Sequence, residues 1–324
     1  MTKKHIYIYS PAGAVRDKAA FRRGVARLKT LGHEVEIDAD ALTSHQRFAG
    51  DDTTRLAAIH RAAASGCDVA MISRGGYGLT RILDGIHYKA VAKSIDKGTQ
   101  FVGFSDFTAF NLSVLAKTGK QTWAGPALID DFAAIGLAGE PDGHGHADLP
   151  SGPDDIMEDC FNDMITGQGE GAGWRLSKER EPVATPTAIH IKNATLWGGN
   201  LAVLSGLVGT PYLPSIEGGI LFLEDVAEHP YRIERMLTQL LLSGVLARQK
   251  AIVLGQFTLY KLSQHDKGFN LQIVVDWLRS RLKIPVLTNL PFGHVGTKVL
   301  LPVGAKVNLV VQDRDAFILW GHQH

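Results

Sequence analysis

Three side chains in this sequence could together carry out nucleophilic acyl transfer: Ser105, Glu224 and His294. In such a relay an imidazole takes the hydroxyl proton, and a carboxylate fixes the imidazole tautomer. Ser105 follows the apolar run Thr99-Gln-Phe-Val-Gly-Phe and precedes apolar residues at helical spacing, which predicts a strand-to-helix turn. Such a turn lifts the hydroxyl clear of a sheet and directs the backbone N–H of Asp106 toward a developing oxyanion.

Each of these residues also has an ordinary structural interpretation. Ser105 could simply cap the helix that follows it, because serine is a favoured N-cap residue. Glu224 ends the apolar run over residues 219–223, and a carboxylate there could pair with an arginine such as Arg232.

His294 is one of 13 histidines and by itself could be a structural residue. It stands out because it lies between two glycines in the loop Pro-Phe-Gly-His-Val-Gly, after an apolar strand-like run. The chain order of serine, acid and histidine resembles that of α/β-hydrolases. Their Gly-x-Ser-x-Gly signature is incomplete, since Gly103 fits but Phe107 occupies the place of the second glycine, which argues against an α/β-hydrolase proper.

Strand-like and helical patterns alternate through the first part of the chain, with strands expected over 6–9, 34–38 and 68–73 and helices over 17–31 and 51–64. This alternation predicts a parallel sheet with helices on both faces. Ligands bind such sheets beyond the carboxyl ends of the strands, where Ser105 and the loop Arg74-Gly-Gly-Tyr-Gly fall. Gly75 and Gly76 permit close backbone approach to a ligand, so one of their N–H groups could be a second oxyanion donor; an ordinary glycine turn is the alternative.

The pattern changes in the second half of the chain. A helix is expected over 154–165, and the glycine-rich stretch 167–173 indicates a linker. From Trp174 onward short strands prevail, interrupted by amphipathic helices over 231–242 and 270–282. We therefore expect an α/β domain over 1–166 and a β-rich α+β domain over 174–324.

Composition limits the function classes. The chain has 324 residues, 45% hydrophobic and 21% charged, and a net charge of +1 with dispersed Lys and Arg, so neither disorder nor nucleic-acid binding is expected. No apolar run approaches the roughly 18 residues of a transmembrane helix, and the apolar run near the N-terminus is too short for a signal peptide. Cys67 and Cys160 form no disulfide framework, which makes the cytoplasm the expected compartment.

One loop could in principle recruit a metal. His144 and His146 lie with Asp142 and Asp148 in a stretch rich in glycine and proline. A pair of ligands on a loop without a supporting strand or helix is more typical of a solvated loop, so no metal and no cofactor are expected.

Six ordered motifs resemble the LD-carboxypeptidases, also called muramoyltetrapeptide carboxypeptidases, and their relatives the microcin C immunity peptidases. The resemblance extends over nearly the whole chain. It rests on Ser10-Pro-Ala-Gly, Arg74-Gly-Gly-Tyr-Gly, Gly103-Phe-Ser-Asp, Trp197-Gly-Gly-Asn-Leu, Leu223-Glu-Asp-Val with Pro230-Tyr-Arg-Ile-Glu-Arg-Met-Leu, and Gly293-His.

The resemblance implies a role for each candidate residue. Ser105 corresponds to the family's nucleophile, Glu224 to its orienting acid and His294 to its base, with the N–H groups of Asp106 and Gly76 holding the oxyanion. It also implies a flavodoxin-like, doubly wound N-terminal domain, a β-rich C-terminal domain, a homodimer and no metal. The residues expected to bind substrate are Arg74, Gly75, Trp197 and Asn200.

The implied reaction removes the terminal D-alanine from a muropeptide tetrapeptide, at the amide after meso-diaminopimelate or lysine, in cytoplasmic peptidoglycan recycling. An immunity-type peptidase that cuts an aminoacyl-nucleotide amide with the same triad is the alternative; Trp123 and Trp197 are possible platforms for its nucleobase. A non-catalytic muropeptide-binding protein is a second alternative. A glutamine amidotransferase would need cysteine at position 105, which this chain lacks.

Overall fold

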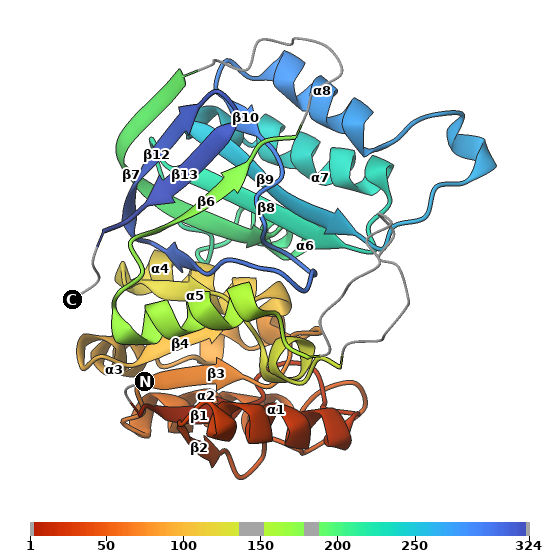
Figure 1. The fold of residues 1–324 in the computed structure, drawn as a ribbon. Helices are drawn as coiled ribbons and strands as arrows, with labels where there is room; N and C mark the ends of the chain where they lie inside the picture. Colours follow the sequence, from red (N-terminus) through yellow and green to blue (C-terminus); the bar gives the residue numbers. More distant parts are fainter. Residues whose placement is uncertain (1–2, 136–151, 178–187, 322–324) are drawn as a thin grey trace. The chain divides into compact units, whose positions relative to one another are not determined.

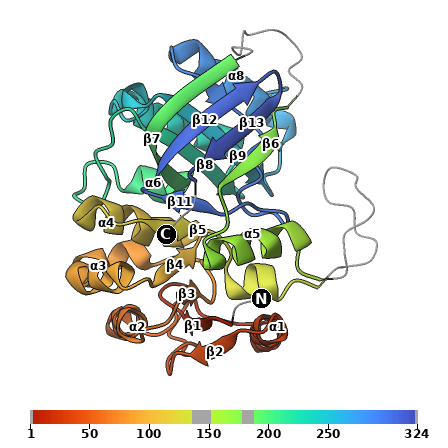
Figure 2. The same cartoon turned by 60° about the vertical axis from the view of Figure 1, so that its left-hand side comes forward.

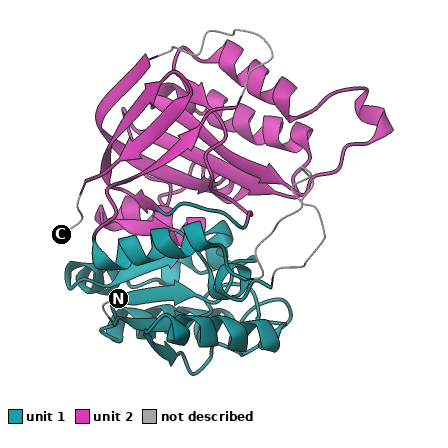
Figure 3. Cartoon of the chain, viewed as in Figure 1, with its two compact units in different colours: residues 1–107, 125–167, 296–300 teal, residues 108–124, 168–295, 301–324 magenta. Residues whose placement is uncertain are grey.

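The computed structural model describes residues 3–135, 152–177 and 188–321. Two compact units make up the chain, and Figure 3 shows them in different colours. The first unit comprises Met1–Phe107, Gly125–Gly167 and Gly296–Leu300, and the second comprises Thr108–Ala124, Gln168–Val295 and Leu301–His324. Within the described ranges, no helix is long and apolar enough to cross a membrane.

Strands and helices alternate in the first unit, as predicted. The strands are β1 (His5–Tyr9), β2 (Glu34–Ile37), β3 (Val69–Ile72) and β4 (Gln100–Gly103), and the α-helices are α1 (Lys18–Thr30), α2 (Asp52–Ala64), α3 (Tyr88–Asp96) and α5 (Asp155–Thr166). Short helical turns are η1 (Leu79–Arg81), η2 (Leu83–Gly85), η3 (Ser105–Phe107) and η4 (Leu128–Phe132). Asp17, Asp51 and Asp154 begin three of the α-helices, because each carboxylate accepts a hydrogen bond from a backbone N–H three residues on.

The strands of the first unit form a parallel sheet in the order β2-β1-β3-β4. This is the flavodoxin-like order, and α1 and α5 cover one face while α2 and α3 cover the other (Figure 2), so the predicted doubly wound sheet is confirmed. Because β1 and β3 are neighbours, the loops after them meet at the carboxyl edge. There the hydroxyls of Ser10 and Ser73 lie 2.5 Å apart, and the Gly13 N–H donates to the Gly75 carbonyl at 3.0 Å.

The second unit contains a seven-stranded mixed sheet in the order β10-β9-β8-β7-β12-β13-β6. Its parallel half consists of β7 (Ala188–Asn200), β8 (Ile220–Val226), β9 (Ala251–Thr258) and β10 (Val286–Leu287); β12 (Lys306–Gln312), β13 (Asp315–Leu319) and β6 (Gly171–Arg175) run antiparallel. Residues 220–223 of β8 are all fully buried, as expected for a central parallel strand. Glu224 and Asp225, which follow in the same strand, are also buried.

Helices pack against the parallel half of this sheet (Figure 1). Among them, α6 (Leu201–Gly206) contacts β7 and β8, α7 (Pro230–Leu242) contacts α6 and α8 (Leu271–Arg281), and α8 contacts β10. The unit also holds α4 (Thr108–Thr118), the short turns η5 (Leu246–Arg248) and η6 (Gln264–Asp266), and an antiparallel pair formed by β5 (Thr122–Ala124) and β11 (Leu301–Val303).

The units differ from the contiguous domains expected from the sequence. A boundary does fall at Gly167, next to the expected linker, but part of 167–173 is strand, since β6 starts at Gly171. Residues 108–124 cluster with the second unit and residues 296–300 with the first. Each of these two short segments clusters with residues that are distant in sequence. Local sequence patterns do not reveal such contacts.

Candidate active site

Ser105 sits on a strained turn in the first unit. It follows β4 after one residue, begins the 3-10 turn η3, and has a φ of 63°. An N-cap residue has extended backbone angles, so this positive φ does not fit the simple capping role. A non-glycine residue in that region costs about 1–3 kcal/mol and is concentrated at functional sites. The local backbone therefore matches the predicted nucleophile turn.

The glycine loop after β3 packs directly against this turn. A methyl group added at Gly75 would lie 2.8 Å from Ser105 Cβ and 2.9 Å from Ser105 Oγ, too close for any side chain. Gly76 has a φ of 110°, which favours glycine. The Asp106 carboxylate is buried and accepts a hydrogen bond from the Leu79 N–H at 2.9 Å, and burial raises the pKa of Asp106. The turn and the loop thus support each other.

A buried arginine from α2 holds the same loop in place. Arg55 is fully buried and donates to the carbonyls of Pro11 at 3.3 Å and Gly78 at 2.8 Å, while Asp52 balances its charge. It therefore ties together the loops that follow β1 and β3. Sequence reasoning missed Arg55, because an arginine within an amphipathic helix is normally solvent-exposed.

Arg74, the expected carboxylate-binding residue, lies at the start of this loop. Its Nη1 donates to the Ala14 carbonyl at 3.1 Å, whereas its Nε is buried with no hydrogen-bond partner among the described residues. A guanidinium presents five donors, so Arg74 retains capacity to bind an anion.

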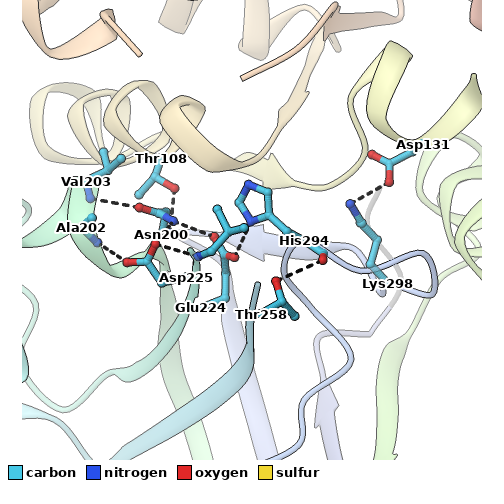
Figure 4. A network of polar contacts seen from close by, with 11 residues as sticks. Thr108, Asp131, Asn200, Ala202, Val203, Glu224, Asp225, Thr258, His294 and Lys298 are labelled. Carbon is cyan, nitrogen blue, oxygen red and sulfur yellow. Dashed lines mark hydrogen bonds and ion pairs between the residues drawn. The ribbon is translucent and has the colours of Figure 1, made fainter. Parts of the chain in front are cut away.

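A second buried cation, Lys298, belongs to the short segment that joins the first unit. Its Nζ lies 2.6 Å from Asp131 Oδ1 and 3.7 Å from the centre of the Phe104 ring, next to Ser105 in sequence. Both charged side chains are almost completely buried, and Asp131 also accepts from the Ala127 N–H at 2.8 Å. Figure 4 labels Lys298 and Asp131 and marks the contact between them with a dashed line.

In the second unit, the predicted acid and base form a pair. Glu224, fully buried within β8, places Oε2 2.9 Å from Nδ1 of His294 (Figure 4). A methyl group at Gly293 would lie 3.1 Å from the same oxygen, and the φ of Gly293 is 138°, so glycine allows the His294 loop to approach. In a serine-histidine-acid relay the acid binds Nδ1 and Nε2 transfers the proton. Arg232 pairs with Glu228 at 2.9 Å, which removes the alternative partner considered for Glu224.

Asn200 and Asp225 surround the acid. The Asn200 amide donates to Glu224 Oε1 at 3.2 Å and to Asp225 Oδ1 at 3.0 Å. Its backbone N–H donates to Thr108 Oγ1 at 2.9 Å. Burial and the neighbouring Glu224 carboxylate raise the pKa of Asp225 to about 6. Sequence reasoning assigned no role to Asp225 or Thr108; the adjacent Glu-Asp carboxylates at a strand end were the available signal for the former.

Two other sequence predictions concern Trp197 and metal binding. The Trp197 side chain is almost completely buried, and its indole N–H donates to Gln249 Oε1 at 2.9 Å, so the substrate-binding role expected for it finds no support in its surroundings. No group of three or more His, Cys, Asp or Glu residues able to hold a metal occurs in the described part of the chain. His144 and His146 lie outside the described residues.

Comparison with known proteins assigns the family. Sequence profiles of the LD-carboxypeptidase N-terminal and C-terminal domains match residues 6–125 and 193–309. A putative carboxypeptidase of Synechocystis is 32% identical, with 95% of this chain and 91% of that protein covered. The chain belongs to the LD-carboxypeptidase family. Ser105 lies within the first matched range, and Glu224 and His294 lie within the second.

Other relatives of this carboxypeptidase carry more specific names. A probable murein peptide carboxypeptidase of Bacillus subtilis is 28% identical, covering 90% of this chain and 84% of that protein. The microcin C7 self-immunity protein of Escherichia coli is 27% identical, covering 76% and 72%. A crystal structure of the muramoyltetrapeptide carboxypeptidase from Oxalobacter formigenes has a TM-score of 0.82 and 38% identity over 98% of both chains.

Proposed function

We propose that this carboxypeptidase is a serine peptidase that removes the terminal D-alanine from muropeptide tetrapeptides by cleaving an L,D-amide. The observation that carries the proposal is the contact between Glu224 and His294 Nδ1, because it prepares the imidazole to act as a base. The strained turn at Ser105 supplies the matching nucleophile. The 38% identical structure named muramoyltetrapeptide carboxypeptidase supports the choice of substrate.

The proposed reaction has two half-steps and requires the enzyme to bring Ser105 to His294. The Ser105 hydroxyl attacks the L-configured acyl carbon, and His294 Nε2 takes the hydroxyl proton. The N–H groups of Asp106 and Gly76 hold the oxyanion. His294 then donates its proton to the leaving D-alanine amine as the C–N bond breaks. A water molecule, deprotonated by His294, releases the acyl group and restores the hydroxyl of Ser105.

Arg74 is our candidate for binding the terminal carboxylate of the substrate, because its Nε has no hydrogen-bond partner among the described residues and the guanidinium keeps donors for an anion. The proposal further includes a muropeptide as partner, a cytoplasmic role in peptidoglycan recycling, a homodimer and a reaction that uses neither metal nor cofactor. Light scattering tests the dimer. Dialysis against EDTA tests the last point, since activity lost and then restored by zinc would refute it.

The decisive assay uses two tetrapeptides that differ only in the last residue. The enzyme should release D-alanine from the natural peptide and leave the L-alanine epimer intact, because the oxyanion donors and Arg74 select one configuration around the scissile amide. Amino-acid analysis of the products measures both reactions. Comparable release from both epimers would contradict the proposed stereochemistry.

The microcin C7 self-immunity relative supports a second candidate, cleavage of an aminoacyl-nucleotide amide by the same residues. A parallel assay with an aminoacyl sulfamoyl adenosine separates the two, because kcat/KM ranks the substrates directly. A protein that only binds muropeptides remains a third candidate. It would not react with a fluorophosphonate probe, whereas an activated Ser105 should be labelled.

A further inference from the structure

Two neighbouring carboxylates, Glu224 and Asp225, are buried near the end of β8, and Glu224 contacts His294 at 2.9 Å. Asp225 is 3% exposed and faces the start of α6 instead. Successive side chains of a regular strand point to opposite faces. The pairing of β8 with β9 shifts register between Leu223 and Asp225, an irregularity that re-aims side chains. The register shift thus accounts for the direction of the Asp225 side chain, but the reaction steps proposed above assign Asp225 no role.

Asn200 connects the two carboxylates. Its Oδ1 accepts a hydrogen bond from the Val203 N–H at 3.1 Å, capping α6, and this contact fixes which side of the amide is oxygen. The amide nitrogen consequently faces Glu224 Oε1 and Asp225 Oδ1 and donates to both. One NH₂ group thus bridges the acid that holds His294 and the acid beside it.

Asp225 is itself held by the backbone. Its Oδ2 accepts from the Ala202 N–H at 2.9 Å, and its Oδ1 accepts from its neighbour's N–H, that of Val226, at 2.8 Å. With Asn200, these donors satisfy both oxygens and fix the carboxylate. Four residues therefore form a continuous chain of polar contacts (Figure 4): Asp225, Asn200, Glu224 and His294.

We propose that Asp225 is a positioning residue for the base: through Asn200 it orients Glu224, and its charge stabilises the protonated form of the His294 imidazole. This inference rests on the proposed function of Glu224 and His294. A buried network of this kind is effective because each member restricts the next, and because charges interact strongly at low local dielectric. Asp225 does not touch the reacting atoms.

The test replaces the charge while preserving the shape of the side chain. Asp225→Asn should lower kcat for the tetrapeptide by about 10–100-fold with little change in KM, because the base is displaced and the bound ground state is not. The pH at which His294 is half protonated, followed by NMR of the free enzyme, should move down, because a nearby negative charge is lost. Asp315→Asn, a matched change at an exposed site in the same unit, should alter neither quantity.

A double-mutant cycle checks the route of the effect. If Asp225 acts through Asn200, the double variant Asn200→Ala with Asp225→Asn should be no slower than Asn200→Ala alone. If the kcat losses of the two single variants instead multiply in the double variant, Asp225 does not act through Asn200 and the proposed route is wrong. Circular dichroism and a thermal melt establish that each variant is folded. If Asp225→Asn does not fold, kcat and the His294 titration midpoint are measured for Asn200→Ala instead, and wild-type values of both would contradict the proposed route.

The NMR titration of His294 requires no substrate. The proposed function and the positioning role of Asp225 can therefore be contradicted separately. A wild-type enzyme that leaves the tetrapeptide intact contradicts the proposed function. A His294 midpoint and a kcat that both stay at wild-type values in a folded Asp225→Asn variant contradict the positioning role, whatever the substrate is.

Discussion

Ser105 adopts a positive φ that a capping serine does not need, and the residue types alone could not show this. Its position after an apolar strand was readable from the sequence, as were the carboxylate of Glu224 at a strand end and the glycine beside His294. The contact between Glu224 and His294 joins residues 70 positions apart, so it required the fold. Asp225 stayed unassigned because its role depends on a bridging amide from another strand.

Alanine variants of the three proposed triad members test whether they act as a unit. Ser105→Ala and His294→Ala should each lower kcat by about 10⁴-fold or more, and Glu224→Ala by somewhat less. Steady-state kinetics on the tetrapeptide measures these losses. Cys160→Ser should retain turnover. Near-normal activity in Ser105→Ala would rule out this nucleophile.

The raised pKa of Asp225 predicts a pH-dependent stability. Its value of about 6 in the folded protein lies above the ordinary 3.8, so the folded state binds more protons between these values. The contribution of Asp225 to the free energy of unfolding should therefore fall as the pH rises from about 4 to 6, and stay constant above. Urea denaturation of the wild type and Asp225→Asn at several pH values measures the difference. If the free energy of unfolding of the wild type, relative to that of Asp225→Asn, instead rose between about pH 4 and 6, the predicted direction would be wrong.

At the scale of elements, predicted and observed structure agree best where local chemistry is decisive. The helices α1, α2 and α5 lie within one residue of their predicted ends, because capping aspartates and apolar spacing mark them. The strand β7 extends through Asn200, far beyond the four residues predicted from 188 to 191. Polar residues at 192 and 193 interrupt its apolar pattern, and its pairing with β12 contains a register shift there.

The glycine loop gives a prediction at this scale. Gly75→Ala should lower kcat/KM by about 100-fold or more, because the new methyl group would displace Ser105 from its position. Gly206→Ala is the matched control, since a methyl group there lies within 4 Å of no atom in the part of the chain that the structure describes. Steady-state kinetics and a fluorophosphonate labelling rate report the displacement. Wild-type labelling of Gly75→Ala would mean that the loop does not position the nucleophile.

At the scale of the whole molecule, neither unit is one continuous stretch of chain. The first unit closes only with residues 296–300, whose Lys298 neutralises the buried Asp131. Lysine side chains are mostly solvent-exposed, so nothing in the local sequence marks Lys298 as buried, and its partner Asp131 lies 167 residues away. Local patterns therefore predicted the fold class, but could not show that residues 108–124 cluster with the second unit and residues 296–300 with the first.

Replacing the buried Lys298 by a neutral residue should strongly destabilise the first unit. Lys298→Met leaves Asp131 as an unpaired buried charge and should lower the free energy of unfolding by about 3–5 kcal/mol. Replacing both partners, with Asp131→Leu added, should recover much of that loss. Urea denaturation measures both effects, with the exposed Lys306→Met as control. A single variant as stable as the wild type would show that the pair is not needed.

The late arrival of residues 296–300 also orders events during protein synthesis. About 129 residues separate Gly167 from Gly296, which at roughly 5–20 residues per second takes a ribosome about 6–26 s. Until residue 294 is reached the nascent chain already carries Ser105, but it lacks both His294 and Lys298, the lysine in the segment that completes the first unit. Hydrolytic capacity should thus emerge only after His294 and residues 296–300 have been synthesised, and a chain released before that point by a stalled ribosome should carry an inert serine.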